Sequence, residues 1–357
     1  MAAVALRTPV VLCLFNRPET TRRVLEVIAA VRPRRLFVIA DGPRPDRPDE
    51  ARRCIEARRL IETMLPDCEL IRDYAAENLG CGRRIASGLT RVFEQTPEAI
   101  VLEDDCLPDP SFFAYCDALL ERYRDDARVM MVSGSNDLIA WRAADRDYHY
   151  SRYGSVWGWA SWRRAWRHYD FAMTTWHDPA GRARLAEVLG DEEQVRHRAG
   201  ICDRTAAGAV DTWDYQWTWA RLRHGGLTVV PARNLVSNLG FGRGATHTVA
   251  RFALGANAPR YAVAPPLRPP TAVAADAEYD RRWFEWQVGR PSAAAVLERA
   301  RALRDAGRHA QLLLLGRDPV ATARLDADAR AELDDLTAQA VAALRAVRSP
   351  ATRGDRS

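Results

Sequence analysis

Lysine is absent from this chain of 357 residues, so all 52 of its basic residues are arginine. The arginines are scattered among 47 acidic residues, and the formal net charge is only +5. A protein that binds nucleic acid would instead gather its cations in a stripe or patch facing the phosphates. The even mixture predicts no nucleic-acid partner, and we attribute the arginine usage to a general compositional preference.

Membrane-spanning and secreted classes of protein are also disfavoured by what is missing. No apolar run approaches the length of a membrane span, and the apolar run Pro9–Phe15 is too short for a secretory signal. The seven cysteines are odd in number and include no CxxC pair. Reduced, structural thiols in a cytoplasmic protein are the expected account.

The common glycine-rich nucleotide motifs are missing as well. After the first apolar run the chain continues Asn16-Arg17-Pro18, where a dinucleotide-binding turn would have GxGxxG. The GxxxxGK[ST] phosphate loop cannot occur without lysine. An ordinary NAD- or ATP-binding sheet is therefore not expected.

What is present, from residue 9 to about 135, is an alternation of short apolar runs and helical segments. Strands spaced by helices of this length predict βαβ units in an α/β fold. The sheet should be mostly parallel and Rossmann-like, with helices on both faces. The expected strands are Val10–Phe15, Arg35–Ala40, Glu69–Arg72, Ile100–Leu102 and Val129–Ser133, and the expected helices Thr20–Val31, Arg47–Met64, Gly82–Gln95 and Pro110–Tyr123.

The rest of the chain divides by composition. Residues 148–250 are less regular and rich in tryptophan, and we group residues 1–255 as one domain. Residues 256–290 are rich in proline and alanine and predict a connecting segment. Residues 291–347 predict a C-terminal helical extension, with amphipathic helices at Ala293–Ala306 and Asp326–Val347, and residues 348–357 a disordered tail.

Three consecutive carboxylates, Glu103, Asp104 and Asp105, follow the apolar run Ile100–Leu102 directly. A buried strand that ends in acids holds them at its carboxyl edge, where open α/β sheets place their ligands. Hard oxygen ligands at such an edge suit Mg²⁺ or Mn²⁺ that also binds substrate phosphates. The alternative is a solvated acidic turn after a strand.

A set of landmarks in a fixed order resembles a known family. They are Asn16-Arg17, Asp41, Glu103-Asp104-Asp105 with Pro110-Ser111-Phe112-Phe113, Gly158-Trp159, Trp213-Asp214 and Phe241-Gly242-Arg243. Over residues 8–250 the chain resembles GT-A fold glycosyltransferases of the N-acetylglucosaminyltransferase I type. It looks closer still to bacterial family 2-like or hemolytic-protein-like nucleotide-diphospho-sugar transferases. The last hundred residues resemble nothing we can name.

The resemblance implies a metal-dependent, inverting glycosyltransferase that uses a nucleotide-diphosphate sugar, UDP-sugar by preference, and a glycan or lipid-linked acceptor. It implies Asp105 as the direct ligand of Mn²⁺ or Mg²⁺, with Glu103 and Asp104 holding donor hydroxyls. Asp41 would accept from the uracil N–H, and Asn16 and Arg17 would lie near the nucleotide, where the planar guanidinium suits phosphates. Asp41 before Gly-Pro could instead be a turn former, and Arg17 a surface residue.

Asp214 matches the position of the catalytic base in the resembling family. Its tryptophan neighbours should desolvate it and raise its pKa. The family pattern places a second acid after the base, where this chain has Tyr215. Asp211 is the competing carboxylate, and a helix N-cap is the alternative role for Asp214.

The glycine-rich loop that follows residue 238 suits a lid over phosphates. Arg243, Thr246 and His247 are its candidate donor-binding residues, and metal ligation by His247 stays open. Trp159 and Trp213 are candidates to stack on sugar faces. Trp162 and Trp166 fit a core role better.

Two other functions remain as alternatives. A sugar-1-phosphate nucleotidyltransferase would want a Gly- and Arg-rich loop with a downstream lysine, which this chain lacks. A non-catalytic sugar-nucleotide-binding protein is opposed by the intact acids. The arginine-bearing helices after Pro291 could cover the sheet, pair with another subunit, or touch the inner membrane face peripherally; the first is our default expectation.

Overall fold

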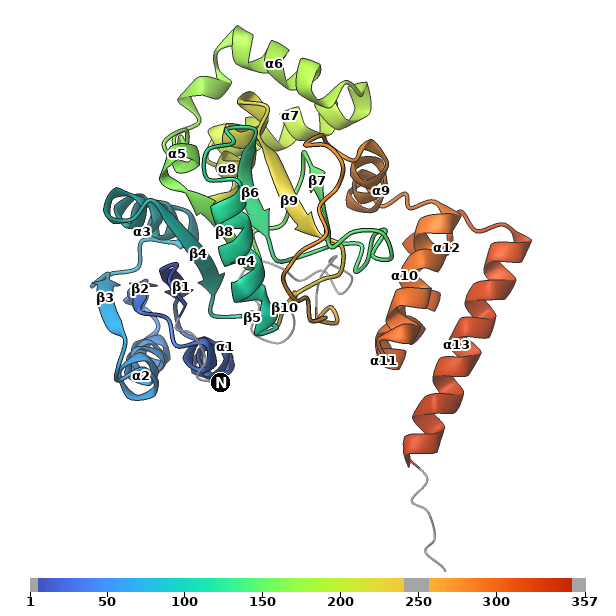
Figure 1. Cartoon of the computed structure of the whole chain (residues 1–357), viewed down its shortest axis with the longest axis horizontal. Helices are drawn as coiled ribbons and strands as arrows, with labels where there is room; N and C mark the ends of the chain where they lie inside the picture. The colour runs from blue at the N-terminus through green and yellow to red at the C-terminus, as the bar shows by residue number, and fades with distance from the viewer. Residues whose placement is uncertain (1–5, 241–256, 349–357) are drawn as a thin grey trace, which may run out of the picture. The chain divides into compact units, whose positions relative to one another are not determined.

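The computed structural model of the chain describes residues 6–240 and 257–348 and divides into two compact units (Figure 1). The first unit consists of Met1–Asp137 and Trp141–Ala277, and the second of Leu138–Ala140 and Glu278–Ser357. The expected connecting segment, residues 256–290, spans the boundary between these two units. Most of it belongs to the first unit, and the division falls at Ala277.

The first unit is built on a sheet of eight strands in the order β3-β2-β1-β4-β8-β6-β9-β7. Strands β1 to β4 are parallel to one another, as are β6 and β9, whereas β8 runs antiparallel to β4 and β6, and β7 antiparallel to β9. The predicted α/β class with a mostly parallel sheet is confirmed. The strands are β1 (Val10–Leu14), β2 (Arg35–Ala40), β3 (Glu69–Tyr74), β4 (Glu98–Glu103), β6 (Val129–Ser133), β7 (Tyr148–Ser151), β8 (Trp159–Trp162) and β9 (Leu227–Pro231).

Helices cover both faces of this sheet, as predicted, because its central strands are apolar on both sides. In β1, Val10 and Leu12 belong to one core cluster and Val11 and Cys13 to the other, the alternation that a strand's two-residue period imposes. One cluster includes side chains of α1 (Pro18–Val31), α2 (Pro48–Met64) and α4 (Ser111–Arg122); the other includes side chains of α3 (Cys81–Gln95), α5 (Arg163–Trp166) and α8 (Asp214–Arg223).

A second, two-stranded sheet follows the three acids without a gap. It pairs β5 (Cys106–Pro108) with β10 (Val236–Asn238) in antiparallel register. The backbone N–H of Leu239 donates to the carbonyl oxygen of Asp105 at 2.8 Å. Asp104 and Asp105 therefore form the turn between β4 and β5, which is held at both ends by strand pairing.

The segment expected to be less regular contains helices between β8 and β9. These are the 3₁₀ turn η1 (Thr174–Trp176), α6 (Pro179–Leu189) and α7 (Glu192–Ala206), and they precede α8. Asp178 and Asp191 cap α6 and α7, accepting hydrogen bonds from the N–H groups of Ala180 at 3.0 Å and Gln194 at 2.8 Å. Aspartate is a favoured N-cap because its oxygen satisfies an N–H that has no partner within the helix.

The second unit is helical. Its elements are α9 (Ala277–Gln287), α10 (Ala293–Asp305), α11 (His309–Gly316), α12 (Pro319–Thr322) and α13 (Ala327–Arg348), and α13 packs against α10 and α11. The two predicted amphipathic helices are confirmed within a residue at each end, while α9 lies in the segment expected to be a connection. Among the described residues, no helix combines the length and apolar character needed to cross a membrane.

Candidate functional site

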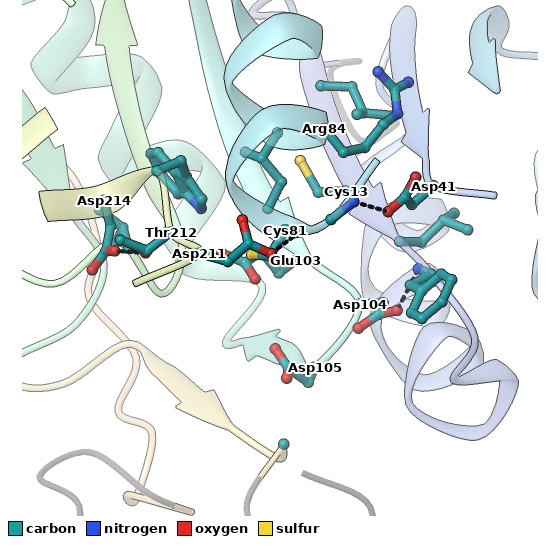
Figure 2. A pocket seen from close by; sticks show the side chains of 18 of the residues that line it. Cys13, Asp41, Cys81, Arg84, Glu103, Asp104, Asp105, Asp211, Thr212 and Asp214 are labelled. Atoms are coloured by element: carbon teal, nitrogen blue, oxygen red, sulfur yellow. Dashed lines mark hydrogen bonds between the residues drawn. The ribbon is translucent and has the colours of Figure 1, made fainter. Parts of the chain in front are cut away.

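A cavity of about 550 Å³ opens at the carboxyl ends of β1, β2 and β4. It is lined by residues that follow these strands, by the first turns of α3 and α8, and by the end of β10 (Figure 2). Strand β1 pairs with β2 on one side and β4 on the other, so the chain changes direction across the sheet here. Open α/β sheets bind ligands at this switch point.

The three acids lie at the centre of this cavity. Glu103 ends β4 and is level with Cys13 of β1, while Asp104 and Asp105 follow in the turn and are only 5% and 7% exposed. The N–H of Phe15 donates to Asp104 at 2.9 Å. The guanidinium of Arg17 reaches Asp104 at 3.5 Å and makes a closer ion pair with Asp105. The alternative of a solvated acidic turn is therefore wrong.

Burial and mutual repulsion perturb these carboxylates. Burial, followed by the charges of Asp105 and Asp104, raises the pKa of Glu103 well above its usual range. Burial and the charge of Asp105 raise the pKa of Asp104 to about 7, although Arg17 opposes the rise. Groups that shift one another in this way form a site that favours an added cation.

The donor set is compatible with a hard divalent ion. The side chains around Asp105 offer carboxylate oxygens, and the guanidinium of Arg17 already stands there as a positive charge. Backbone also approaches closely, because a Cβ on Gly240 would come within 2.0 Å of Asp105 Oδ2. Within residues 6–240 and 257–348 no three His, Cys, Asp or Glu side chains form a ready metal cage. Mg²⁺ and Mn²⁺ need none when substrate phosphates and water supply the remaining oxygens.

Asp41, predicted to contact the nucleotide base, already accepts hydrogen bonds from the loop around it. Its carboxylate accepts from the N–H groups of Gly42 and Leu79, both at 2.9 Å, from the N–H of Gly80 at 3.1 Å and from the side-chain amide of Asn78 at 3.0 Å. Burial raises the pKa of Asp41, and these N–H donors oppose the rise. Four donors fill the acceptor capacity of a carboxylate. Asp41 lines the cavity, but a uracil N–H would have to displace one of them.

The two candidate catalytic bases, Asp211 and Asp214, differ in their hydrogen bonds. Asp211 accepts from the backbone N–H groups of Cys81 at 3.1 Å and Gly82 at 3.0 Å, and so caps α3. Asp214 is the first residue of α8, whose N-cap is Trp213, so the alternative of Asp214 as N-cap is wrong. The hydroxyl of Thr212 donates to Asp214. Burial raises the pKa of Asp214, and the Thr212 hydrogen bond opposes that rise.

The two tryptophans predicted to stack on sugars have different places. Trp159 is 1% exposed, stacks on Trp213 with ring centroids 5.6 Å apart, and does not line the cavity. Its predicted stacking role is wrong, because its ring belongs to the core beside Trp166, and Trp162 is buried in the core cluster on the other face of the sheet. Trp213 is also buried but lines the cavity, and Trp157 lines it with a partly exposed ring that the sequence did not single out.

The remaining predicted donor residues are not brought together here. Asn16 is not among the lining residues, and its carbonyl oxygen accepts from Arg53 at 2.8 Å. Arg243, Thr246 and His247 lie outside the described residues. Two lining cations were missed, Arg44 and Arg84. Arg44 lies in the loop before α2 and Arg84 in α3, and nothing in the sequence around either one distinguishes it from an ordinary surface arginine.

Comparison of the sequence with models of protein families and with curated proteins finds no match. The function is therefore argued from the geometry of this cavity.

Proposed function

We propose that the chain is a metal-dependent, inverting glycosyltransferase of the GT-A type. It would move a sugar from a nucleotide diphosphate, most simply UDP, to a hydroxyl of a glycan, a lipid-linked glycan or another acceptor. One observation carries the proposal. The buried triplet Glu103–Asp105 and the carboxylate of Asp214, more than a hundred residues away in the chain, line one cavity at the switch point of the sheet.

The triplet supplies the donor end of the reaction. Asp105 would hold Mn²⁺ or Mg²⁺, which when bound neutralises charge on the departing diphosphate. Glu103 and Asp104 would accept hydrogen bonds from hydroxyls of the donor. Arg17 now lies against Asp104 and Asp105. Once a metal ion neutralises the negative charge of these acids, the planar guanidinium of Arg17 would be able to donate to phosphate oxygens in the same cavity.

Asp214 supplies the acceptor end. As the acceptor oxygen attacks the anomeric carbon, the bond from that carbon to the diphosphate breaks and Asp214 takes the hydroxyl proton. A base of this kind works best when its pKa lies near the working pH. Burial raises the pKa of Asp214 in that direction, against the Thr212 hydrogen bond. Trp157 and Trp213 offer ring surface beside it.

The test is a screen of UDP-, GDP- and dTDP-sugars for thermal stabilisation with and without Mn²⁺. We expect stabilisation by one nucleotide family that requires the metal, followed by slow hydrolysis of the donor. Asp105→Ala should abolish metal-dependent nucleotide binding, whereas Asp214→Ala should preserve it and remove transfer and hydrolysis. A wild-type protein that binds none of the three donors with metal would refute the proposal. Reaction of a nucleoside triphosphate with a sugar 1-phosphate would favour the nucleotidyltransferase, and binding without turnover the non-catalytic alternative.

A further inference from the structure

Asn238, the last residue of β10, places a buried amide in the wall of the cavity. Only 6% of the residue is exposed, and it lines the cavity together with Gly240 and the three acids. Its backbone pairs with Cys106 of β5, the residue that follows Asp105. The amide therefore belongs to the part of the wall next to the proposed metal ligand.

One hydrogen bond fixes the orientation of this amide. The backbone N–H of Gly240 donates to Asn238 Oδ1 at 2.7 Å, in the turn that an Asn side chain often forms with the residue two positions ahead. A backbone N–H can only donate, so the side-chain atom that it meets must be the oxygen. The side-chain nitrogen, Nδ2, keeps both of its N–H groups, and it donates to no atom of the described residues.

The amide of Asn238 and the carboxylate of Asp105 meet at Gly240. A Cβ on this glycine would lie 2.0 Å from Asp105 Oδ2 and 3.1 Å from Asn238 Oδ1, so both side chains lie against the same point of the backbone. The guanidinium of Arg17 also reaches Asp105, as its ion-pair partner. Two kinds of hydrogen-bond donor, a guanidinium and an amide, are thus placed around one carboxylate.

A buried amide whose N–H groups are unused calls for an acceptor in the cavity. A phosphate oxygen fits, because it only accepts hydrogen bonds and its charge strengthens those that it accepts. The diphosphate is also the group that we propose to bind beside Asp105 through the metal ion. A sugar hydroxyl fits less well, since it can donate its own proton to the carboxylates nearby.

Resting on the proposed function, we propose that Asn238 donates a hydrogen bond to a phosphate oxygen of the nucleotide diphosphate. Asn238 is then a substrate-binding residue that holds the departing group from the end of β10, while Arg17 would hold it from the loop after β1. The amide orients the diphosphate without adding charge to the cavity. Its contribution should therefore be visible in nucleotide binding alone, without turnover.

Two substitutions separate this contact from the turn that Asn238 also forms. Asn238→Asp keeps an oxygen for the N–H of Gly240 but loses both amide N–H groups, whereas Asn238→Ala loses the N–H groups and the turn without adding charge. In calorimetric titration with Mn²⁺, each variant should bind UDP about tenfold to a hundredfold more weakly than the wild type, the range for a hydrogen bond to a charged group. Uridine, which has no phosphate, should bind all three proteins equally.

Metal binding is a second readout, and it should not fall with nucleotide binding. Asn238→Asp should bind Mn²⁺ without nucleotide at least as tightly as the wild type, because the new carboxylate lies near Asp105. The EPR signal of the free ion measures this. The matched control is Asn257→Asp, at an exposed residue outside the cavity wall whose backbone N–H donates to the carbonyl oxygen of Asn238 at 2.9 Å. It should keep the wild-type affinity for UDP.

The pattern across the variants decides the matter. A loss of UDP affinity in Asn238→Ala alone would mean that the residue only builds the turn. A loss in Asn238→Asp alone, or an equal loss in Asn257→Asp, would make added charge the cause, and a loss of Mn²⁺ or uridine binding together with UDP would indicate a distorted site. Each of these results overturns the inference.

Should Asn238→Ala fail to fold, Asn238→Asp read against Asn257→Asp still tests the contact. Wild-type protein that binds UDP with metal while both Asn238 variants keep its affinity would overturn this inference and leave the transferase proposal intact. Wild-type protein that does not bind UDP with metal would overturn both.

Discussion

Replacing Asp104 by asparagine should stabilise the metal-free protein while it destroys the site. Asp104 is 5% exposed, and burial with the charge of Asp105 raises its pKa from an ordinary 3.8 to about 7. An acid whose pKa is raised by folding makes the folded state less stable above its unfolded pKa. The penalty grows between pH 4 and 7 and is complete above pH 7. At 1.36 kcal/mol per pH unit, the rise corresponds to about 4 kcal/mol.

That figure is an upper limit for Asp104→Asn. The asparagine oxygen can still accept from the N–H of Phe15, but the weaker ion pair with Arg17, at 3.5 Å, is lost. We therefore expect a net gain of about 2–3 kcal/mol at pH 8 and little or none at pH 4. In return, UDP with Mn²⁺ should stabilise the variant far less than it stabilises the wild type.

The assay is urea unfolding in EDTA at pH 4, 6 and 8, followed by thermal unfolding with UDP and Mn²⁺. Asp67→Asn, at an exposed position, is the control and should not alter the pH dependence. An Asp104→Asn protein no more stable than the wild type at pH 8, or a difference that does not change with pH, would refute the reasoning about repulsion within the triplet.

Three further predictions distinguish residues that act in turnover or ligand binding from residues that stabilise the fold. Asp214→Asn should lower turnover by about 10²–10⁴-fold while the affinity for UDP with metal, measured by calorimetry, stays within a factor of two or so. Asp211→Ala should cost about 1 kcal/mol in urea unfolding through loss of the α3 cap and leave metal-dependent UDP binding in place. Trp159→Ala should cost about 3–5 kcal/mol of stability, whereas Trp157→Ala, at a partly exposed ring packed against the core, should cost less stability and weaken acceptor binding. The first prediction is wrong if UDP affinity falls together with turnover, and the second if metal-dependent UDP binding is lost together with stability. The third is wrong if the two tryptophan variants lose the same stability.

Sequence reasoning was most successful where one period governs a whole segment. The strand Arg35–Ala40 was predicted without error and the helix at 82–95 within one residue, because the apolar residues of each follow one simple repeat. It missed β5 and β10, since three residues are too few to show alternation. The polar helices between β8 and β9 were missed because their apolar residues do not form a continuous stripe.

Within the site, the residue types predicted which side chains line the cavity better than they predicted the role of each one. The acids Asp41, Glu103, Asp104 and Asp105 all line the cavity as expected. Nothing in the sequence shows that Asp41 already accepts four hydrogen bonds, because its donors come from residues 42 and 78–80. The sequence likewise cannot rank eleven tryptophans, since burial depends on which of them meet across the sheet.

The number of N–H groups around each acid is the property that separates the carboxylates of this cavity. Asp41 and Asp211 accept from backbone N–H groups that order the start of α3, so their charges are already used in building the wall. Asp104 accepts one backbone N–H, from Phe15, and Asp105 relies chiefly on Arg17. A carboxylate left with so few donors in a buried turn gains further stabilisation when a ligand brings positive charge or hydroxyl groups. The metal and donor chemistry should therefore lie with the triplet, and substitutions at Asp41 or Asp211 should act through the shape of the cavity.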